Sequence, residues 1–300
     1  MRILVFGSLN IDHDYYVDHR GAPGETITAD SLSLAVGGKG LNQAIAIAKA
    51  GASVALAGAV GPDGGMLLQT LQDHGVDVSL IKHVDQPTGH AIITIDRHGS
   101  NDIMIFGGAN RQIDAAYVSQ VLAGYGPGDI MVVENEISAM KDVLSQAHAK
   151  GMTIVANPSP FDPQILGWPL DDIDWFFINE VEGAGLTGGA DIPSMPAALA
   201  ARFPKAQVVL TLGGQGAYYL HAGQAQHQPA SHVKAIDTVG AGDTFLGYFT
   251  AGLARGRDPR ACLRLASTAA GICVTRKGAA ASIPTADEVE AVLASSPATD

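Results

Sequence analysis

The chain has few cysteines, few charged residues and no long hydrophobic run. Cys262 and Cys273 are its only cysteines, which excludes a disulfide framework and a cysteine-rich zinc site. Its ten histidines lack the spacing typical of metal ligands. No apolar run reaches the roughly 18 residues of a membrane span, and the apolar start is too short for a signal sequence. We therefore expect a cytoplasmic protein with no membrane partner.

Basic residues are also scarce. Lysine and arginine total 18 against 30 acidic residues, which gives a net charge of −12. So few basic residues, thinly spread, argue against a nucleic-acid or anionic-membrane partner. An anionic small ligand stays possible, because backbone N–H groups and one or two local cations can bind it.

Apolar residues and glycine are abundant. Apolar residues make up 47% of the 300 residues and charged residues 16%, which is a globular composition. The length suits one large α/β domain or two small ones. Glycine occurs 36 times, well above the usual ~7%, and it is concentrated at a few short turns.

Short apolar runs alternate with helical segments along most of the chain. The predicted strands are residues 2–7, 53–59, 129–134, 152–157, 174–178 and 207–212. The predicted helices between them are residues 40–50, 64–73, 137–150 and 194–203. This alternation predicts a mainly parallel sheet with helices on both faces, and a ligand at the carboxyl ends of the strands.

Three segments do not fit this alternation. Residues 12–18 and 26–36 are strand-like, and residues 89–106 are typical of a hairpin with a turn at 97–100. They predict a small inserted β-layer, from about 12–36 and 88–107, within a single domain of residues 1–300. Apolar residues on both of its faces indicate that it covers a ligand or a partner subunit; an ordinary extension of the main sheet is the alternative.

The strongest local signal is the segment DTVGAGDTF at residues 237–245. Gly240, Ala241 and Gly242 form a tight turn that opens a helix, with Asp243 at its start. Such a turn exposes backbone N–H groups to an anion. The alternative is that Asp243 is a helix cap, but the bare glycine turn favours the close approach of another group.

Two further polar turns lie near the start of the chain. The segment GGKGLNQA at 37–44 places Lys39 and Asn42 in a glycine turn and helix, and GSLNID at 7–12 places Asn10 and Asp12 on one side of a strand. An amide with a carboxylate suits neighbouring hydroxyl groups. Both can also be plain turns, and neither a Walker A loop nor G-x-G-x-x-G occurs.

Two strand ends in the second half carry polar or glycine-rich turns. The segment NEVE at 179–182 suits hydrated Mg²⁺ or phosphate, or it caps a helix. The segment TLGGQGA at 211–217 is another glycine turn, which alone would be an ordinary hairpin.

Taken in order, these segments closely resemble the ribokinase family, the PfkB-type carbohydrate kinases. The resemblance covers nearly the full length and includes the region of Glu136, NPSP at 157–160 and VTRKGA at 274–279. The pair GGKG and GAGD is the most specific part. The fold implied is a ribokinase-like three-layer αβα sandwich with a small β-sheet lid.

The resemblance assigns a role to most of these residues. Asp243 is implied as the base for the sugar hydroxyl, and the N–H groups of Gly240, Ala241, Gly242 and Asp243 as the anion hole. The implied sugar-binding residues are Asn10, Asp12, Gly38, Lys39, Gly40, Asn42, Glu136 and Asp243. The implied ATP-binding residues are Asn179, Thr211, Leu212, Gly213, Gly214, Gln215, Gly216, Gly242 and Ser267.

The resemblance also implies two metal ions and a partner. Glu182 matches the residue that organises hydrated Mg²⁺. The positions that match a monovalent cation site for K⁺ are Asp237, Val239, Cys273, Arg276, Gly278 and Ser282. In the family, the lid closes over the sugar and pairs with a second lid, so a homodimer is expected.

The expected reaction is ATP-dependent phosphorylation of D-ribose to D-ribose 5-phosphate. The segments NID and VTRKGA are most similar to the ribose-phosphorylating members. Glu134 departs from the family pattern, which is usually neutral there, and it changes which hydroxyls are accepted if it faces the pocket. The alternatives are a kinase of another sugar or a nucleoside, and a non-catalytic sugar- or nucleotide-binding regulator.

Overall fold

A nine-stranded sheet forms the centre of the computed structural model, which describes residues 1–295. Its order is β13-β12-β11-β10-β9-β8-β1-β4-β5, parallel from β11 to β5, with β12 and β13 antiparallel at one edge. The strands are β1 (Ile3–Phe6), β4 (Val54–Val60), β5 (Ile81–His83), β8 (Ile130–Val133), β9 (Thr153–Ala156), β10 (Trp175–Asn179), β11 (Gln207–Thr211), β12 (Ala217–His221) and β13 (Gln224–Gln228).

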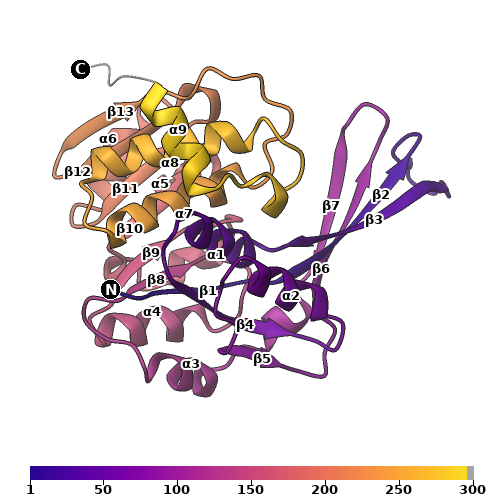
Figure 1. The fold of residues 1–300 in the computed structure, drawn as a ribbon, viewed down its shortest axis with the longest axis horizontal. Helices are drawn as coiled ribbons and strands as arrows, with labels where there is room; N and C mark the ends of the chain where they lie inside the picture. Colours follow the sequence, from indigo (N-terminus) through magenta and orange to yellow (C-terminus); the bar gives the residue numbers. More distant parts are fainter. Residues whose placement is uncertain (296–300) are drawn as a thin grey trace.

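Helices cover both faces of this sheet (Figure 1). Successive strand residues point to opposite faces, so Val5 packs in one core while Leu4 and Phe6 pack in the other. One face is covered by α1 (Lys39–Lys49), α2 (Gly65–Asp73), α7 (Ala241–Ala254), α8 (Pro259–Cys273) and α9 (Ala286–Ser295). The other is covered by α3 (Ala115–Leu122), α4 (Met140–Ala149), α5 (Glu180–Thr187) and α6 (Met195–Arg202). The predicted three-layer αβα architecture is confirmed.

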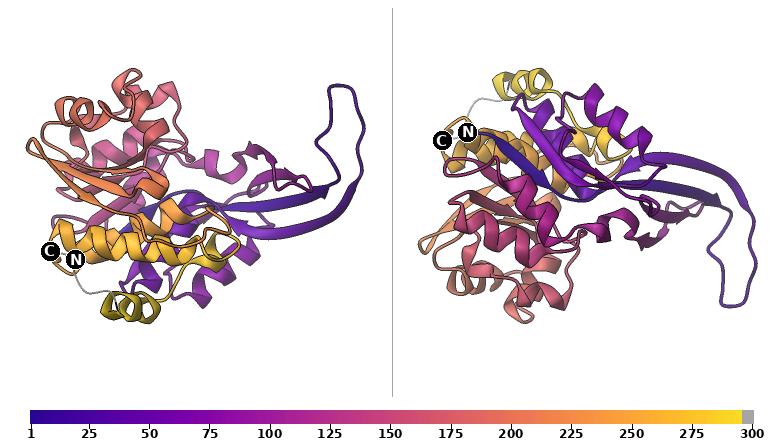
Figure 2. Two further views of the ribbon diagram at one scale, coloured as in Figure 1. Left: turned by 90° about the horizontal axis from the view of Figure 1, so that it is seen from above. Right: turned by 90° about the horizontal axis from the view of Figure 1, so that it is seen from below.

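A second sheet of four strands projects from this body (Figures 1 and 2). We call it the small sheet; its order is β3 (Ala29–Gly37), β2 (Asn10–Val17), β6 (Gly89–Ile95) and β7 (Asn101–Phe106). Strands β2 and β6 pair in parallel, and β3 and β7 pair antiparallel at the edges. The β2–β3 connection reaches farthest from the body (Figure 2).

The predicted elements agree with the structure in the centre and fail at the periphery. All six predicted strands are present, as are the four predicted helices and the turn at 97–100. The helix expected from 137 begins at Met140, because Ala139 takes a left-handed φ of 58°. The sequence analysis missed β5, β12, β13 and the helices α3, α5, α8 and α9. Within residues 1–295, no helix is long and apolar enough to span a bilayer.

The close packing of α1 on α7 positions the polar residues described next. A Cβ added to Gly247 would lie 2.4 Å from the Cβ of Ala46, so the two helices meet there at minimal distance. Each helix begins at a glycine with positive φ, Gly38 at 95° and Gly240 at 77°. These two glycine turns therefore open side by side at the carboxyl edge of the parallel strands.

Candidate active site

Asp243 lies at the centre of the site, in the first turn of α7. Its carboxylate accepts hydrogen bonds from Gln43 Nε2 at 2.9 Å and from Asn42 Nδ2 at 3.3 Å. Gly240 occupies the N-cap position, and no side chain caps α7. The alternative interpretation of Asp243 as a helix cap is therefore wrong, because its carboxylate binds α1 instead.

Burial and charge act in opposite directions on Asp243. Burial raises the pKa of this carboxyl group above its ordinary value, while the charge of Lys39 and the two amide hydrogen bonds lower it. An acid with a raised pKa can accept a proton more readily than an exposed aspartate. The site thus holds a buried carboxylate with raised basicity at the mouth of a glycine turn.

Lys39, the first residue of α1, lies among carboxylates. Burial acts to lower its pKa, but the negative charges of Asp243, Glu136, Glu134 and Glu182 raise it overall. The ammonium group therefore stays charged, and it interacts with acidic side chains from three separate segments of the chain.

A hydrogen-bonded network joins the end of β1 to the residues after β8. Ser8 Oγ donates to Glu136 Oε2 at 2.8 Å, and Asn10 Nδ2 donates to the same oxygen at 3.3 Å. Asn110 holds Asn10 by donating to its Oδ1 at 2.8 Å, and its own Oδ1 accepts from Leu9 N at 3.1 Å. These bonds fix the direction of the Asn10 and Glu136 side chains.

Asp12 approaches the same site from the small sheet. Burial, together with the charges of Asp14 and Glu136, raises the pKa of Asp12 to about 7. Asp12 and Asp14 lie on one face of β2, because they are two residues apart on a strand. Asp12 therefore gains its charge as the pH rises through neutrality.

Asn179 and Glu182 form a capping box at the start of α5. Asn179 Oδ1 accepts from the N–H groups of Val181 and Glu182, and Glu182 Oε2 accepts from Asn179 N at 2.7 Å. The alternative interpretation, that the segment NEVE caps a helix, is thus confirmed for Asn179 and Glu182. Glu182 is also near enough to Lys39 to raise its pKa, so it belongs to the same site.

The glycine turn at the end of β11 lies beside this cap. Thr211 is paired in register with Asn179 on the neighbouring strand. Residues Gly213–Gln215 form a 3₁₀ turn, and space is open at Gly214, where an added Cβ would meet no atom within 4 Å. Ser267 on α8 lines a separate cavity of about 1350 Å³ between residues 226–232 and α8.

The residues implied for a monovalent cation lie in two adjoining turns. Asp237 accepts from Val239 N at 3.0 Å and from Gly278 N at 2.9 Å, which ties the turns together. Cys273 Sγ and Ser282 Oγ are 3.0 Å apart behind them. The Arg276 guanidinium is itself a cation and is paired with Glu288, so Arg276 could serve a bound cation only through its backbone carbonyl.

These two turns adjoin the glycine turn before α7. A Cβ added to Gly240 would lie 3.0 Å from the Cα of Ala279. In the part of the chain that the structure describes, no cluster of three or more histidine, cysteine or acidic side chains could hold a metal ion. Any ion here would therefore rely on backbone carbonyl oxygens and a single carboxylate.

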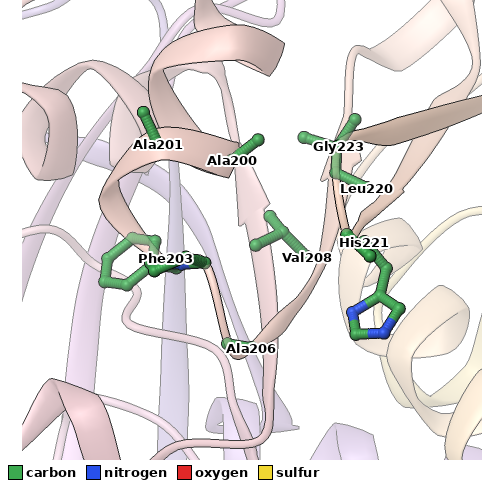
Figure 3. A pocket seen from close by; sticks show the side chains of 10 residues that line it. Ala200, Ala201, Phe203, Ala206, Val208, Leu220, His221 and Gly223 are labelled. Atoms are coloured by element: carbon green, nitrogen blue, oxygen red, sulfur yellow. The ribbon is translucent and has the colours of Figure 1, made fainter.

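A smaller cavity of about 440 Å³ lies away from this site, between the end of α6 and β12 (Figure 3). Ala206 and Val208 line it at the amino end of β11, whereas the candidate site is at the carboxyl end. Most of its lining is apolar, with His221 as its one titratable side chain. We assign it no chemistry.

Most of the predicted site residues converge, but the sequence analysis missed four polar partners. Gln43 binds Asp243, Asn157 accepts from Gln43 Nε2 at 3.3 Å, and Ser8 and Asn110 orient Glu136 and Asn10. Gln43 and Ser8 stand inside the motifs GGKGLNQA and GSLNID, so polar positions within those motifs were the available signal. Asn110 had none, because its contacts cross 100 residues of sequence.

Known proteins are similar to this chain in both sequence and fold. Residues 1–286 match the family model described as pfkB family carbohydrate kinase. A ribokinase of Schizosaccharomyces pombe is 35% identical over 310 residues, which cover 97% of each chain.

Two solved structures are similar over nearly the whole chain. A ribokinase of Cryptococcus neoformans in complex with ADP is 34% identical, with a TM-score of 0.85 over 97% of this chain and 99% of that one. Arabidopsis thaliana ribokinase complexed with ribose and ATP is 30% identical, with a TM-score of 0.84 over 97% of this chain and 98% of that one.

The contact between Gln43 and Asp243 generates a prediction about proton affinity. A hydrogen bond to a charged group contributes ~1.5–3 kcal/mol, and one pKa unit corresponds to about 1.4 kcal/mol. Gln43→Leu removes a bond that favours the ionised carboxylate, so the Asp243 pKa should rise by about one unit or more. Titration of ¹³C-labelled aspartate carboxyl groups by NMR measures this shift. Gln69→Leu, on the exposed face of α2, should leave the Asp243 titration unchanged; an unmoved Asp243 in Gln43→Leu contradicts the assignment.

Proposed function

The chain belongs to the pfkB family of carbohydrate kinases, and we propose that it phosphorylates D-ribose at its 5-hydroxyl group with ATP. The observation that carries this proposal is the buried Asp243 carboxylate, held by Gln43 and Asn42 at the glycine turn that opens α7. This arrangement brings a base and an anion-binding turn together at the start of α7. A regulator that only binds its ligand has no need of a buried base there.

Asp243 takes the proton in the proposed reaction. The 5-hydroxyl oxygen forms a bond to the γ-phosphorus, the bond from that phosphorus to the bridging oxygen of ADP breaks, and the proton passes to Asp243. Phosphoryl transfer goes through a loose transition state, so position and charge matter more than base strength. Space is open at Gly242, where an added Cβ would meet no atom within 4 Å, so the phosphoryl oxygens can approach the N–H groups of Gly242 and Asp243. Ala241 N donates to Thr238 O at 3.3 Å, a bond that must yield if Ala241 is to join this anion hole.

The sugar side of the site has a free acceptor of the right kind. Within the described residues, Asn42 Oδ1 is buried and has no hydrogen-bond partner. A buried amide oxygen without a partner is unfavourable by ~1–3 kcal/mol, which a sugar hydroxyl would relieve. Asn10, Asp12 and Glu136 converge on the same space, while Gly38, Lys39 and Gly40 form the turn beside it.

We assign ATP to the other side of Asp243. The backbone of Thr211, Leu212, Gly213, Gly214, Gln215 and Gly216, with Asn179 beside it, lies at the carboxyl end of neighbouring strands, where nucleotides bind in such sheets. Ser267 lines a cavity large enough for a nucleoside. Use of ATP and two unpaired cysteines, Cys262 and Cys273, support a cytoplasmic location, which cell fractionation tests.

Glu182 suits hydrated Mg²⁺ in this arrangement. It is 3% exposed, and its charge acts on Lys39 within the site. Carboxylate oxygens and retained water molecules are the ligands that Mg²⁺ prefers. When bound, Mg²⁺ neutralises charge on the phosphate oxygens. Glu182 holds its own orientation through the bond to Asn179 N.

We assign the turns at 237–239 and 273–282 to K⁺. The Asp237 carboxylate lies where these turns meet, since it accepts from the N–H groups of Val239 and Gly278, and Cys273 and Ser282 are packed behind. The backbone carbonyls of Val239, Gly278 and Arg276 would supply the other oxygen donors. A large monovalent cation accepts such oxygen donors. Asp237 binds Gly278 N, and the neighbouring Ala279 packs against Gly240. A cation that fixed these turns would therefore also help to fix the glycine turn before α7.

This assignment predicts activation by K⁺. At constant ionic strength, turnover should rise with K⁺ and less with Na⁺ or Li⁺, because the smaller ions fit carbonyls spaced for K⁺ poorly. Asp237→Ala should abolish the response. Initial rates measured with tetramethylammonium as the balancing salt test this; equal rates in K⁺ and tetramethylammonium refute the site.

The proposed acceptor generates a prediction about hydroxyl recognition. Asp12 lies largely buried near Glu136, so a sugar that lacks one hydroxyl leaves a polar group unpaired, and D-ribose should exceed 2-deoxyribose in kcat/KM by roughly 10-fold or more. Asp12→Ala should narrow that gap. An ADP-release assay over pentoses, a ketohexose and nucleosides measures both effects.

Asp243→Asn is the control for that assay. It should lose roughly 10²–10⁴ in kcat for every acceptor, as removal of a general base does. Equal treatment of ribose and 2-deoxyribose by the wild type points instead to another sugar or a nucleoside as the acceptor.

We further propose that the small sheet is a lid and pairs with the small sheet of a second copy. It exposes apolar side chains on its edge strands, with Leu34 53% and Met104 63% exposed, which is unusual for a monomer. Sedimentation velocity on the wild type should show a dimer, and Leu34→Asp with Met104→Asp should yield monomers. A wild-type monomer at micromolar concentration contradicts this proposal.

A further inference from the structure

Glu134 is a buried carboxyl group that the proposed reaction does not use. It follows β8 directly, and its exposed fraction is 0%. The sequence analysis expected it to alter the accepted hydroxyls if it faced the pocket. The structure shows that it does not face the pocket, so a direct contact with a sugar is excluded.

The two oxygens of Glu134 instead bind two backbone segments. Oε1 accepts from Ser8 N at the end of β1, and Oε2 accepts from Glu136 N. Ser8 Oγ closes the ring by donating to Glu136 Oε2 at 2.8 Å. The three residues thus form a cycle of hydrogen bonds. Glu136 is a proposed sugar-binding residue and Ser8 contacts its side chain, whereas Glu134 binds the backbone N–H groups of the other two.

This ring has no room to adjust. A Cβ added to Gly7 would lie 3.0 Å from Glu134 Oε1 and 2.8 Å from the Cα of Gly40. Ser8 O also accepts from Leu41 N at 3.0 Å, which ties the ring to the first turn of α1. A displacement of Glu134 would therefore move the end of β1 and Glu136 together.

We propose that Glu134 is a positioning residue, which sets the geometry of Asn10 and Glu136 for the sugar through its bonds to Ser8 and Glu136. This inference rests on the proposed function, because Asn10 and Glu136 are assigned there as sugar-binding residues. It also explains how an acidic residue can stand at this position without repelling the substrate: its oxygens are turned away from the sugar and toward backbone N–H groups.

Ionisation of Glu134 provides a signature of this role. Burial, with the charge of Glu136, raises the pKa of Glu134 to about 8, against the opposing bonds from Glu136 N and Ser8. The other charged groups that face the network are Lys39, which stays protonated, and Asp12, with a pKa of about 7. The bonds from Ser8 N and Glu136 N favour the ionised carboxylate, because the neutral acid has only one good acceptor oxygen. Above pH 8 the ring should therefore be tighter, and KM for the sugar should fall there. A step near pH 7 belongs to Asp12.

The test is Glu134→Gln, with Asp129→Asn as the matched control. Asp129 precedes β8 as Glu134 follows it, and it accepts from Arg2 N at 3.0 Å and Gly126 N at 3.2 Å. It therefore clamps the opposite ends of the same two strands, far from the sugar. A glutamine at 134 can accept only one of the two N–H groups, and it cannot ionise.

Above pH 8, where the wild-type carboxylate is ionised, we expect Glu134→Gln to raise KM for the sugar by about 10-fold, with KM for ATP changed less than about twofold. The fall in the sugar KM above pH 8 should disappear in the variant, while the step near pH 7 remains. Asp129→Asn should lower the urea midpoint and leave both KM values and the pH profile as in the wild type. An unchanged sugar KM with the alkaline limb intact, or equal rises in both KM values, overturns the proposal.

A second variant and a second acceptor make the outcome of this test decisive. If Glu134→Gln does not fold, Glu134→Asp keeps the charge but shortens the side chain, so that it cannot reach both N–H groups; an unchanged sugar KM in that variant overturns the proposal equally. If wild type shows no turnover with ribose, the proposed acceptor is wrong. The same comparison is then made with the best acceptor of the panel, so the two failures are distinguished.

Discussion

The bond between the Asp243 carboxylate and the amides of α1 is the constraint on which the site depends. Gln43 and Asn42 reach Asp243 only because α1 and α7 pack at minimal distance, with Gly247 against Ala46. That packing brings two glycine turns, opened by Gly38 and Gly240, to the same edge of the sheet. In the proposed reaction one turn serves the acceptor and the other the phosphoryl group, so a single helix contact would set the distance between them.

The charge of the site gives the second constraint. Lys39 is surrounded by four carboxylates, so the site holds more negative than positive charge before any substrate binds. A triphosphate can enter such a site only with help from backbone N–H groups, the N-terminus of α7 and bound cations. This imbalance is the physical reason that the proposed reaction relies on Mg²⁺ and K⁺ more than on arginine side chains.

The sequence predicted what local patterns determine and missed what distant contacts determine. Buried parallel strands such as β1 and β8 are continuous apolar runs, so they were found, whereas the polar strand β13 (QAQHQ) has no such signal. Asp243 and Lys39 were found because glycine turns mark them. Asn110 and the orientation of Glu134 were not, since each depends on residues more than 100 positions away.

The site is divided between a rigid and a projecting part, and the two parts do different work. Asp243 and Glu136 are fixed by the main sheet and its helices through bonds that leave little freedom. Asp12 comes from the small sheet, as does Asn10 at the start of β2, where Asn110 and Glu136 bind it. The Asp12 pKa of about 7 depends on burial, and therefore on the position of that sheet. In the proposed reaction, the main sheet thus fixes the groups that carry out the transfer, while the small sheet contributes Asp12 to the choice of acceptor.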